Sequence, residues 1–197
     1  MPEYAPEQTA SLSEPEGRLR LFAELLPIEG KDGDKNRAAR TLVNWMAAAP
    51  ITLDILNAVQ KEFQDELEGE VTQEQRHKIL QSGIFVPVDR PGEGRYFDFP
   101  DGVRDLLLQS IPISISYRVL GVATDVLINQ YPQDEENFRN LAKGNFDAVT
   151  INEHTIALAR AAYGVWRGNW HMPDISRNAT EVLQPKIAAY DAAQTQK

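Results

Sequence analysis

Apolar residues recur every three or four positions through most of this sequence, which is the spacing of one face of an α-helix. The pattern predicts helices over residues 16–26, 36–49, 52–63, 72–82, 101–110, 115–131, 133–143, 152–168 and 178–193. Thr52 or Asp54 can cap one of these helices and Thr72 another, because short polar side chains accept hydrogen bonds from the first turn. Gly83 is a natural left-handed stop, whereas Pro185 interrupts the weak last helix.

A different pattern occupies residues 85–99, where two short apolar and aromatic runs flank the turn-forming residues DRPGEG. The runs FVPV and YFDF predict the strands of a β-hairpin with an exposed tip. Pro87 lacks the N–H that a central strand needs, so we expect the first strand at a free edge. Helix, hairpin and helix in this order predict a winged helix, that is, a helix-turn-helix plus a short β-hairpin, in a mainly α chain.

The C-terminal half reads as helix throughout, so a small helical bundle is expected to follow the winged helix, with a boundary near Pro112. The first residues are rich in Pro, Glu, Ser and Gln and contain little to bury, which is typical of disorder. We therefore expect a disordered lead-in (1–17), a helical arm and linker (18–34), a winged-helix domain (35–111), a helical bundle (112–190) and a disordered tail (191–197).

Composition narrows the class of protein. The sequence has no cysteine, no apolar run approaching the roughly 20 residues of a membrane span, and no signal-peptide pattern at its acidic N-terminus. These features predict a soluble, cytoplasmic protein without disulfides or membrane contact. The net charge of −9 argues against non-specific binding of nucleic acid, because neutralising phosphates requires an excess of Lys and Arg on at least one face.

No arrangement of residues indicates catalysis, a metal or a cofactor. His77, His154 and His171 are far apart, and none belongs to a His-x-x-x-His or His-Glu-x-x-His pattern. The sequence also lacks the Gly-x-Ser-x-Gly turn that carries the nucleophile of many hydrolases. We therefore expect a protein that is not an enzyme and that acts by binding.

Basic residues on the third helix and the hairpin are the first candidates for partner contacts: Arg76, Lys78, Arg90 and Arg95. In a winged-helix transcription regulator, the third helix enters the major groove and the wing touches phosphates, so the same residues would contact DNA. An acidic run from Glu62 to Glu70 precedes this helix and would repel the DNA backbone. DNA binding therefore remains the alternative to protein binding.

A second candidate surface is the aromatic segment YGVWRGNWHMPD, which contains Trp166, Arg167 and Trp170. Tryptophan, tyrosine and arginine dominate the binding energy of protein interfaces. The same aromatic residues could instead pack the end of the helix onto the bundle. The sequence alone leaves both interpretations open.

The segments AAAPITLDILNAVQ, LQSGIFVPV and YFDFPDGVRDLLL resemble the winged-helix region that follows the nucleotide-binding domain of STAND NTPases, signalling ATPases of bacterial conflict and eukaryotic immune systems. The order of segments over residues 37–170 is similar to that of bacterial conflict-system proteins whose NTPase module is inactive or missing. The resemblance implies a regulatory module of an antiviral defence system. It would dock a protein partner, such as a protease effector or a signalling component of the same locus, through the third helix and the hairpin.

The sequence departs from the STAND pattern at the position that senses nucleotide. The family has a Met-His-Asp motif there, and this chain has Phe99, Pro100 and Asp101 ahead of GVRDLLL. Proline offers no donor to a phosphate, and GKDGDK around Lys31 is not a P-loop, so we expect no ATP binding. A simpler interpretation is that FPDGV only caps the next helix, with Arg104 in solvent.

Overall fold

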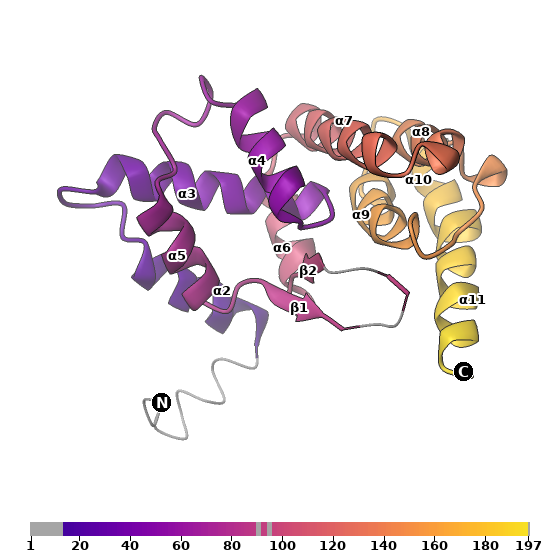
Figure 1. Ribbon diagram of the computed structural model, residues 1–197, viewed down its shortest axis with the longest axis horizontal. Coiled ribbons are helices and arrows are strands. Elements are labelled where there is room, and N and C mark those ends of the chain that lie inside the picture. Colours follow the sequence, from indigo (N-terminus) through magenta and orange to yellow (C-terminus); the bar gives the residue numbers. More distant parts are fainter. Residues whose placement is uncertain (1–13, 90–91, 94–95, 197) are drawn as a thin grey trace.

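The computed structural model describes residues 14–89, 92–93 and 96–196, and these form a mainly α-helical chain with one short antiparallel hairpin (Figure 1). The α-helices and strands are α2 (Pro15–Leu25), α3 (Gly33–Trp45), α4 (Leu53–Glu62), α5 (Gln73–Gln81), β1 (Val86–Val88), β2 (Tyr96–Asp98), α6 (Val103–Ser110), α7 (Ile113–Gln130), α8 (Glu135–Lys143), α9 (Ile156–Arg167), α10 (Pro173–Asn178) and α11 (Gln184–Gln194). Short 3₁₀ turns lie at Met46–Ala48, Pro132–Asp134 and Phe146–Ala148. The described part of the chain contains no helix with the length and hydrophobicity of a membrane span.

The ends of α4 and α5 follow from local side-chain chemistry. The Thr52 hydroxyl accepts a hydrogen bond from the Ile55 N–H at 3.1 Å, and the Thr72 hydroxyl accepts one from the Gln75 N–H at 3.4 Å. Beyond α5, Gly83 has a φ of +66°, a left-handed conformation that glycine adopts without a steric penalty. Both threonine caps and the glycine stop are therefore confirmed.

The hairpin lies against the segment that precedes α4. β1 and β2 pair in antiparallel register, with Val86 opposite Asp98. On the other side of β2, the Phe97 N–H donates to the carbonyl oxygen of Ile51 at 2.8 Å. Among the described residues β1 pairs with β2 only, so it is the edge strand that Pro87 predicts. The result is consistent with a helical domain that carries a small wing.

The helices on either side of residue 112 share one hydrophobic core. α7 packs on α4, and α9 packs on α6 and on the 3₁₀ turn Met46–Ala48. Only Ile111 and Pro112 separate α6 from α7. Figure 1 shows α3, α4 and α5 in one half of the molecule and α7 to α11 in the other. Since the core runs through both halves, a contact in one half can influence the other.

The side chain of Arg104 is largely buried, whereas the simple interpretation of the FPDGV segment places it in solvent. Its side chain is only 15% exposed and forms an ion pair with Asp98 at 2.6 Å. The same guanidinium donates to the carbonyl oxygens of Ala47 at 2.6 Å and Ala49 at 3.1 Å. Its aliphatic stem passes into the interior because α6 lies directly against the 3₁₀ turn. Arg104 therefore ties α6 to this turn and to the hairpin.

The last helices are more continuous than the sequence indicates. Pro185 does not break the chain's helical path, because the five residues before α11, Ala179–Leu183, form a π-helical turn. A wider turn accommodates the missing N–H and the bulk of a proline ring. α11 then continues to Gln194, into the expected tail, and α2 starts at Pro15, inside the expected lead-in. Residues 1–13 of that lead-in lie outside the described residues.

Candidate docking surface

A small apolar groove lies between α4, α5 and the hairpin and encloses a cavity of about 40 Å³. We call it the docking groove, and its lining residues are Ile51, Thr52, Leu53, Leu56, Arg76, Ile79, Leu80, Phe85 and Phe97. α4 and α5 supply one wall and the hairpin supplies the other. Thr52 caps α4 directly before the groove, so the start of α4 is fixed by a local hydrogen bond.

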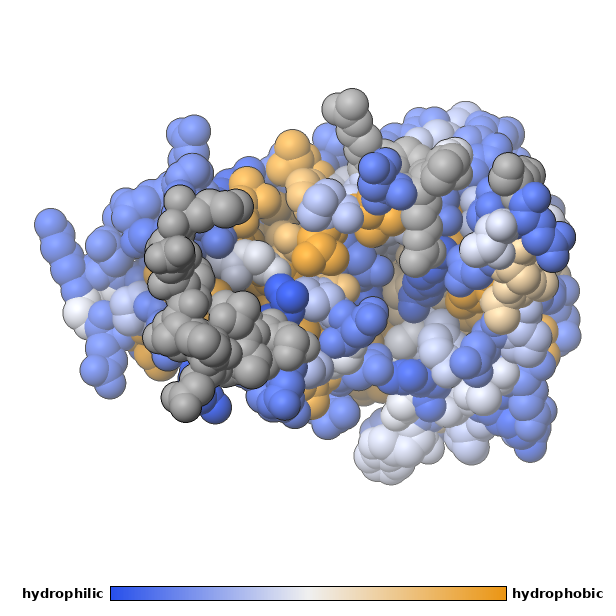
Figure 2. Space-filling view, turned by 90° about the horizontal axis from the view of Figure 1, so that it is seen from below, coloured by the Kyte–Doolittle hydropathy of each residue, from blue (hydrophilic) through white to orange (hydrophobic). Residues whose placement is uncertain are grey.

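Two leucines at the docking groove are unusually exposed for their size. Leu53 is 63% exposed at the first position of α4, and Leu80 is 52% exposed in the last turn of α5. The periodicity predicts Leu80 as a core residue together with Ile79 and Ile84, and this prediction is wrong for Leu80 alone. Figure 2 shows hydrophobic residues gathered in the middle of one face, between the two grey regions. An exposed apolar cluster of this kind is typical of a surface that binds another protein.

Arg76 lies at the polar rim of the groove and forms no ion pair with any residue that the structure describes. Its guanidinium donates to the side-chain oxygen of Asn57 at 2.7 Å and to that of Gln60. Both acceptors are neutral amides, so they orient the guanidinium without cancelling its charge. A carboxylate that approached this edge of the groove would therefore meet a positioned arginine.

The positive charge of Lys78, in contrast, is neutralised by a carboxylate of the same helix. Its ammonium lies 2.9 Å from the Glu74 carboxylate, one turn earlier in α5. The hydrogen bond from Lys78 lowers the pKa of Glu74, so the carboxylate is charged at neutral pH. Arg90 and Arg95, the two predicted contacts on the hairpin, lie outside the described residues. Of the basic residues predicted on the third helix, only Arg76 lines the groove.

The aromatic segment at the end of α9 divides between core and surface. Trp166 is 5% exposed, and its indole N–H donates to the Leu141 carbonyl at 3.2 Å. Its ring lies 4.7 Å from that of Tyr117, centroid to centroid. Trp166 is thus a core residue, which corrects its proposed role in partner binding. Trp170 is 78% exposed and lies against the ring of His171.

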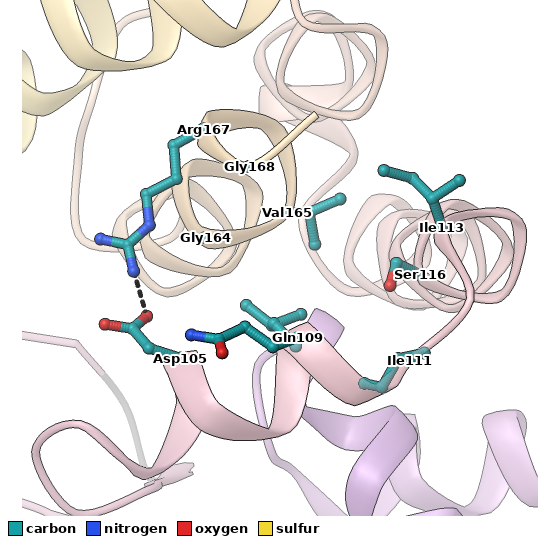
Figure 3. A pocket seen from close by; sticks show the side chains of 10 residues that line it. Asp105, Gln109, Ile111, Ile113, Ser116, Gly164, Val165, Arg167 and Gly168 are labelled. Carbon is teal, nitrogen blue, oxygen red and sulfur yellow. Dashed lines mark ion pairs between the residues drawn. The ribbon is translucent and has the colours of Figure 1, made fainter. Parts of the chain in front are cut away.

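Arg167 faces α6 and not a free surface. Figure 3 shows it reaching from the end of α9 to Asp105, to which it forms an ion pair at 2.5 Å. The pair lies beside a cavity of about 210 Å³ at the junction of α6, α7 and α9. Burial alone would lower the pKa of Arg167, but the hydrogen bonds and charge interactions with Asp105 and Tyr163 together outweigh it and raise that pKa. Arg167 therefore holds two helices together, and the docking groove includes none of the aromatic-segment residues.

The structure brings together one pair of titratable residues that the sequence does not suggest. His154 Nδ1 lies 2.8 Å from the Asp134 carboxylate, and the Tyr131 ring stacks on the imidazole at 4.3 Å. Burial opposes ionisation of Asp134, yet hydrogen bonds from His154 and Asn152 lower its pKa below the ordinary value. His154 and Tyr131 line a cavity of about 380 Å³.

Among the described residues that line this cavity there is no serine or cysteine, and the hydroxyl of Thr52 already caps α4. Among the described residues, no group of three His, Asp or Glu side chains is arranged to hold a metal ion. The contacts of Asp134 and His154 therefore join the end of α7 to the segment before α9.

Comparison with protein-family models, with curated proteins and with solved structures gave no match to this chain. The described residues form a mainly helical protein with a short β-hairpin and an apolar groove beside that hairpin.

Proposed function

We propose that this protein is a non-catalytic interaction module whose docking groove binds an apolar segment of a partner protein. The exposure of Leu53 and Leu80 on either side of an apolar cavity carries this proposal. Large aliphatic side chains on adjacent elements expose apolar area to water, and burying that area against a partner is worth about 25 cal/mol per Å². The capped helix start and the bridged hairpin preorganise the groove, which reduces the entropic cost of binding.

The partner segment that fits the groove carries an aliphatic or aromatic side chain next to an aspartate or glutamate. The apolar side chain enters between Leu53 and Leu80, and the carboxylate reaches Arg76 at the rim. The charge of Arg76 is oriented by Asn57 and Gln60, and both of these are neutral. An ionised acceptor would therefore add a charge-assisted hydrogen bond without displacing an existing ion pair.

The resemblance to STAND-derived conflict proteins suggests where such a partner is found. We propose an effector such as a protease, or a signalling component encoded in the same locus, as the protein that supplies the segment. The protein would then act as a regulatory part of a defence system. This assignment rests on the resemblance alone, whereas the groove and its charge come from the contacts described above.

A winged-helix DNA-binding regulator is the alternative, and the charges of α5 weigh against it. Lys78 is paired with Glu74, and Leu80 presents an apolar side chain in the last turn of the helix that would enter the major groove. Specific DNA interfaces are strongly positive and polar. A neutralised lysine and an exposed leucine are better suited to a protein surface.

Selection of short random peptides displayed on phage tests the proposal. We expect the wild-type protein to enrich peptides that pair an aliphatic or aromatic residue with a neighbouring carboxylate. The Leu80→Asp variant should lose this enrichment, and binding of a selected synthetic peptide should weaken at least about 30-fold, as for a residue central to an interface. Arg76→Gln should remove the preference for the carboxylate and keep that for the apolar residue.

Ile28→Asp is the matched control, since Ile28 is 44% exposed but lies in the connection between α2 and α3, outside the groove. It should bind the selected peptide as the wild type does. Equal peptide binding by the Leu80 and Ile28 variants would refute the groove as the docking site. Binding of random duplex DNA that weakens steeply with salt and is lost in Arg76→Gln would instead favour the regulator.

A further inference from the structure

The segment between the two strands of the wing contains a carboxylate that is completely buried. The side chain of Glu93 is 0% exposed, although the sequence predicts an exposed hairpin tip at this position. A glutamate is almost never fully buried unless it is paired, because ionised groups lose hydration on burial. The partner that Glu93 finds lies far away in the sequence.

That partner is Arg160, on the opposite half of the molecule. The two guanidinium nitrogens of Arg160 lie 3.0 Å and 3.4 Å from the two carboxylate oxygens of Glu93, which is a forked geometry. The Tyr96 hydroxyl donates to Glu93 at 2.7 Å and accepts from Arg160 at 2.7 Å. Arg160 also pairs with Asp191 of α11 at 2.7 Å. One arginine on α9 therefore joins the wing to α11.

The electrostatics of this cluster favour a fully formed network. Arg160 is 17% exposed, and burial alone would lower its pKa, but the hydrogen bond to Glu93 and the other contacts raise it. Removing one partner of the network would leave another charge buried without a counter-charge, because the side chains of Glu93 and Arg160 are only 0% and 17% exposed. The network is therefore stable when complete and costly when half formed, which is how a two-state contact behaves.

The same hairpin supplies one wall of the docking groove. Phe85 precedes β1 and Phe97 lies within β2, and both line the groove, while Tyr96, the neighbour of Phe97, belongs to the Arg160 network. A hairpin of two three-residue strands has little stability of its own. Its position thus depends on its contacts with the rest of the chain, which include the bridge to Ile51, the ion pair between Asp98 and Arg104, and the contact with Arg160.

We propose that Glu93, Arg160 and Asp191 form a latch that fixes the wing to α9 and α11, so that the groove wall and the C-terminal helices change position together. With the latch closed, Phe85 and Phe97 are held in place as the groove wall. With the latch open, the hairpin and α11 are released from one another. The consequence for binding rests on the proposed function, but the latch itself can be tested in the free protein.

Amide hydrogen exchange in the full-length free protein tests the latch. In Arg160→Met, we expect the amides of Val86, Val88 and residues 96–98 to exchange at least about tenfold faster than in the wild type, because local opening no longer breaks a buried ion pair. Amides of α3 should change much less. Glu93→Gln keeps the shape and a hydrogen-bond acceptor, so it should shift the same amides in the same direction by a smaller factor.

The double variant Glu93→Gln/Arg160→Met separates a latch from two independent effects. If the two residues act through each other, hairpin exchange in the double variant should match that of Arg160→Met alone. Independent effects would multiply and would overturn the proposal. So would hairpin exchange that stays at the wild-type rate in a folded Arg160→Met protein.

A global loss of stability requires its own control. Phe138→Leu removes packing from α8, where Phe138 is fully buried and no latch residue is present. It should accelerate exchange in all core helices without singling out the hairpin. If Arg160→Met gives the same uniform pattern, the arginine is a general structural residue and the latch is refuted. None of these measurements involves a partner, so they can fail independently of the peptide selection.

Discussion

Replacement of Arg104 by methionine should destabilise the protein well beyond the usual effect of losing an arginine. The guanidinium supplies three contacts between parts of the chain that are distant in sequence, to the carbonyls of Ala47 and Ala49 and to the Asp98 carboxylate. Methionine keeps much of the aliphatic length but removes the guanidinium, including its cation–π contact with the Phe99 ring. The variant therefore isolates the loss of the charged donor.

The expected loss is about 3 kcal/mol. A hydrogen bond to a charged group contributes about 1.5 to 3 kcal/mol, and its removal leaves the two alanine carbonyls of a buried turn without that donor. Asp98 is 30% exposed, so water replaces part of the lost ion pair and reduces the sum. In a chain of this size, that loss corresponds to a fall of about 6 to 12 °C in melting temperature.

Urea denaturation followed by circular dichroism measures this effect as a lower midpoint at an unchanged slope. Arg139→Met is the matched control, because Arg139 is 51% exposed and pairs with Glu135 one turn away on the same helix. That pair should contribute at most about 0.5 kcal/mol. A loss in Arg104→Met no larger than in the control would refute the structural role assigned to the buried guanidinium.

Two further predictions concern glycine geometry and acid stability. Gly121→Ala should stabilise the protein by about 0.5 to 1 kcal/mol, because its Cβ would meet nothing within 4 Å in α7. Gly144→Ala should lower the free energy of unfolding by roughly 2 kcal/mol or more, since φ is +77° and the Cβ would collide with Ile175. Equal urea midpoints for the two glycine variants would contradict this account. Asp134 has a lowered pKa in the folded state, because the hydrogen bonds from His154 and Asn152 outweigh burial. Its carboxylate therefore stabilises the folded protein above about pH 4, and this contribution is lost as the pH falls through the pKa of the folded state. Asp134→Asn should flatten the fall of the urea midpoint in that acidic range, and an unchanged pH profile would show that this carboxylate is not responsible.

Local signals account for the parts of the fold that were predicted well. The caps at Thr52 and Thr72 and the stop at Gly83 depend on atoms within a few residues of each other, so their chemistry is visible in the sequence. Pro87 similarly indicates an edge strand because it removes a single backbone donor. These signals specify where elements begin and end, and they give the mainly α class with its hairpin.

The candidate site could be predicted only in part, because the exposure of its residues depends on contacts between elements that are distant in the sequence. Arg76 lines the docking groove, whereas Trp166 is buried and Leu80 is exposed. Helical periodicity identifies an apolar face without saying which residues at its edge are covered by another element. Exposure of Leu80 depends on where the hairpin ends, and burial of Trp166 depends on α7 and α8.

The sequence by itself determined the helices, the hairpin and the acidic overall charge, since these depend on composition and on neighbours along the chain. Only the tertiary structure decided the long-range polar contacts. Glu93 and Arg160 are 67 positions apart, and Arg104 and Ala47 are 57 apart. No local sequence pattern links such residues, because the sequence around a charged residue looks the same whether its side chain lies in solvent or in a buried ion pair. Their roles follow from which helices pack together and from the burial that this packing imposes on each charge.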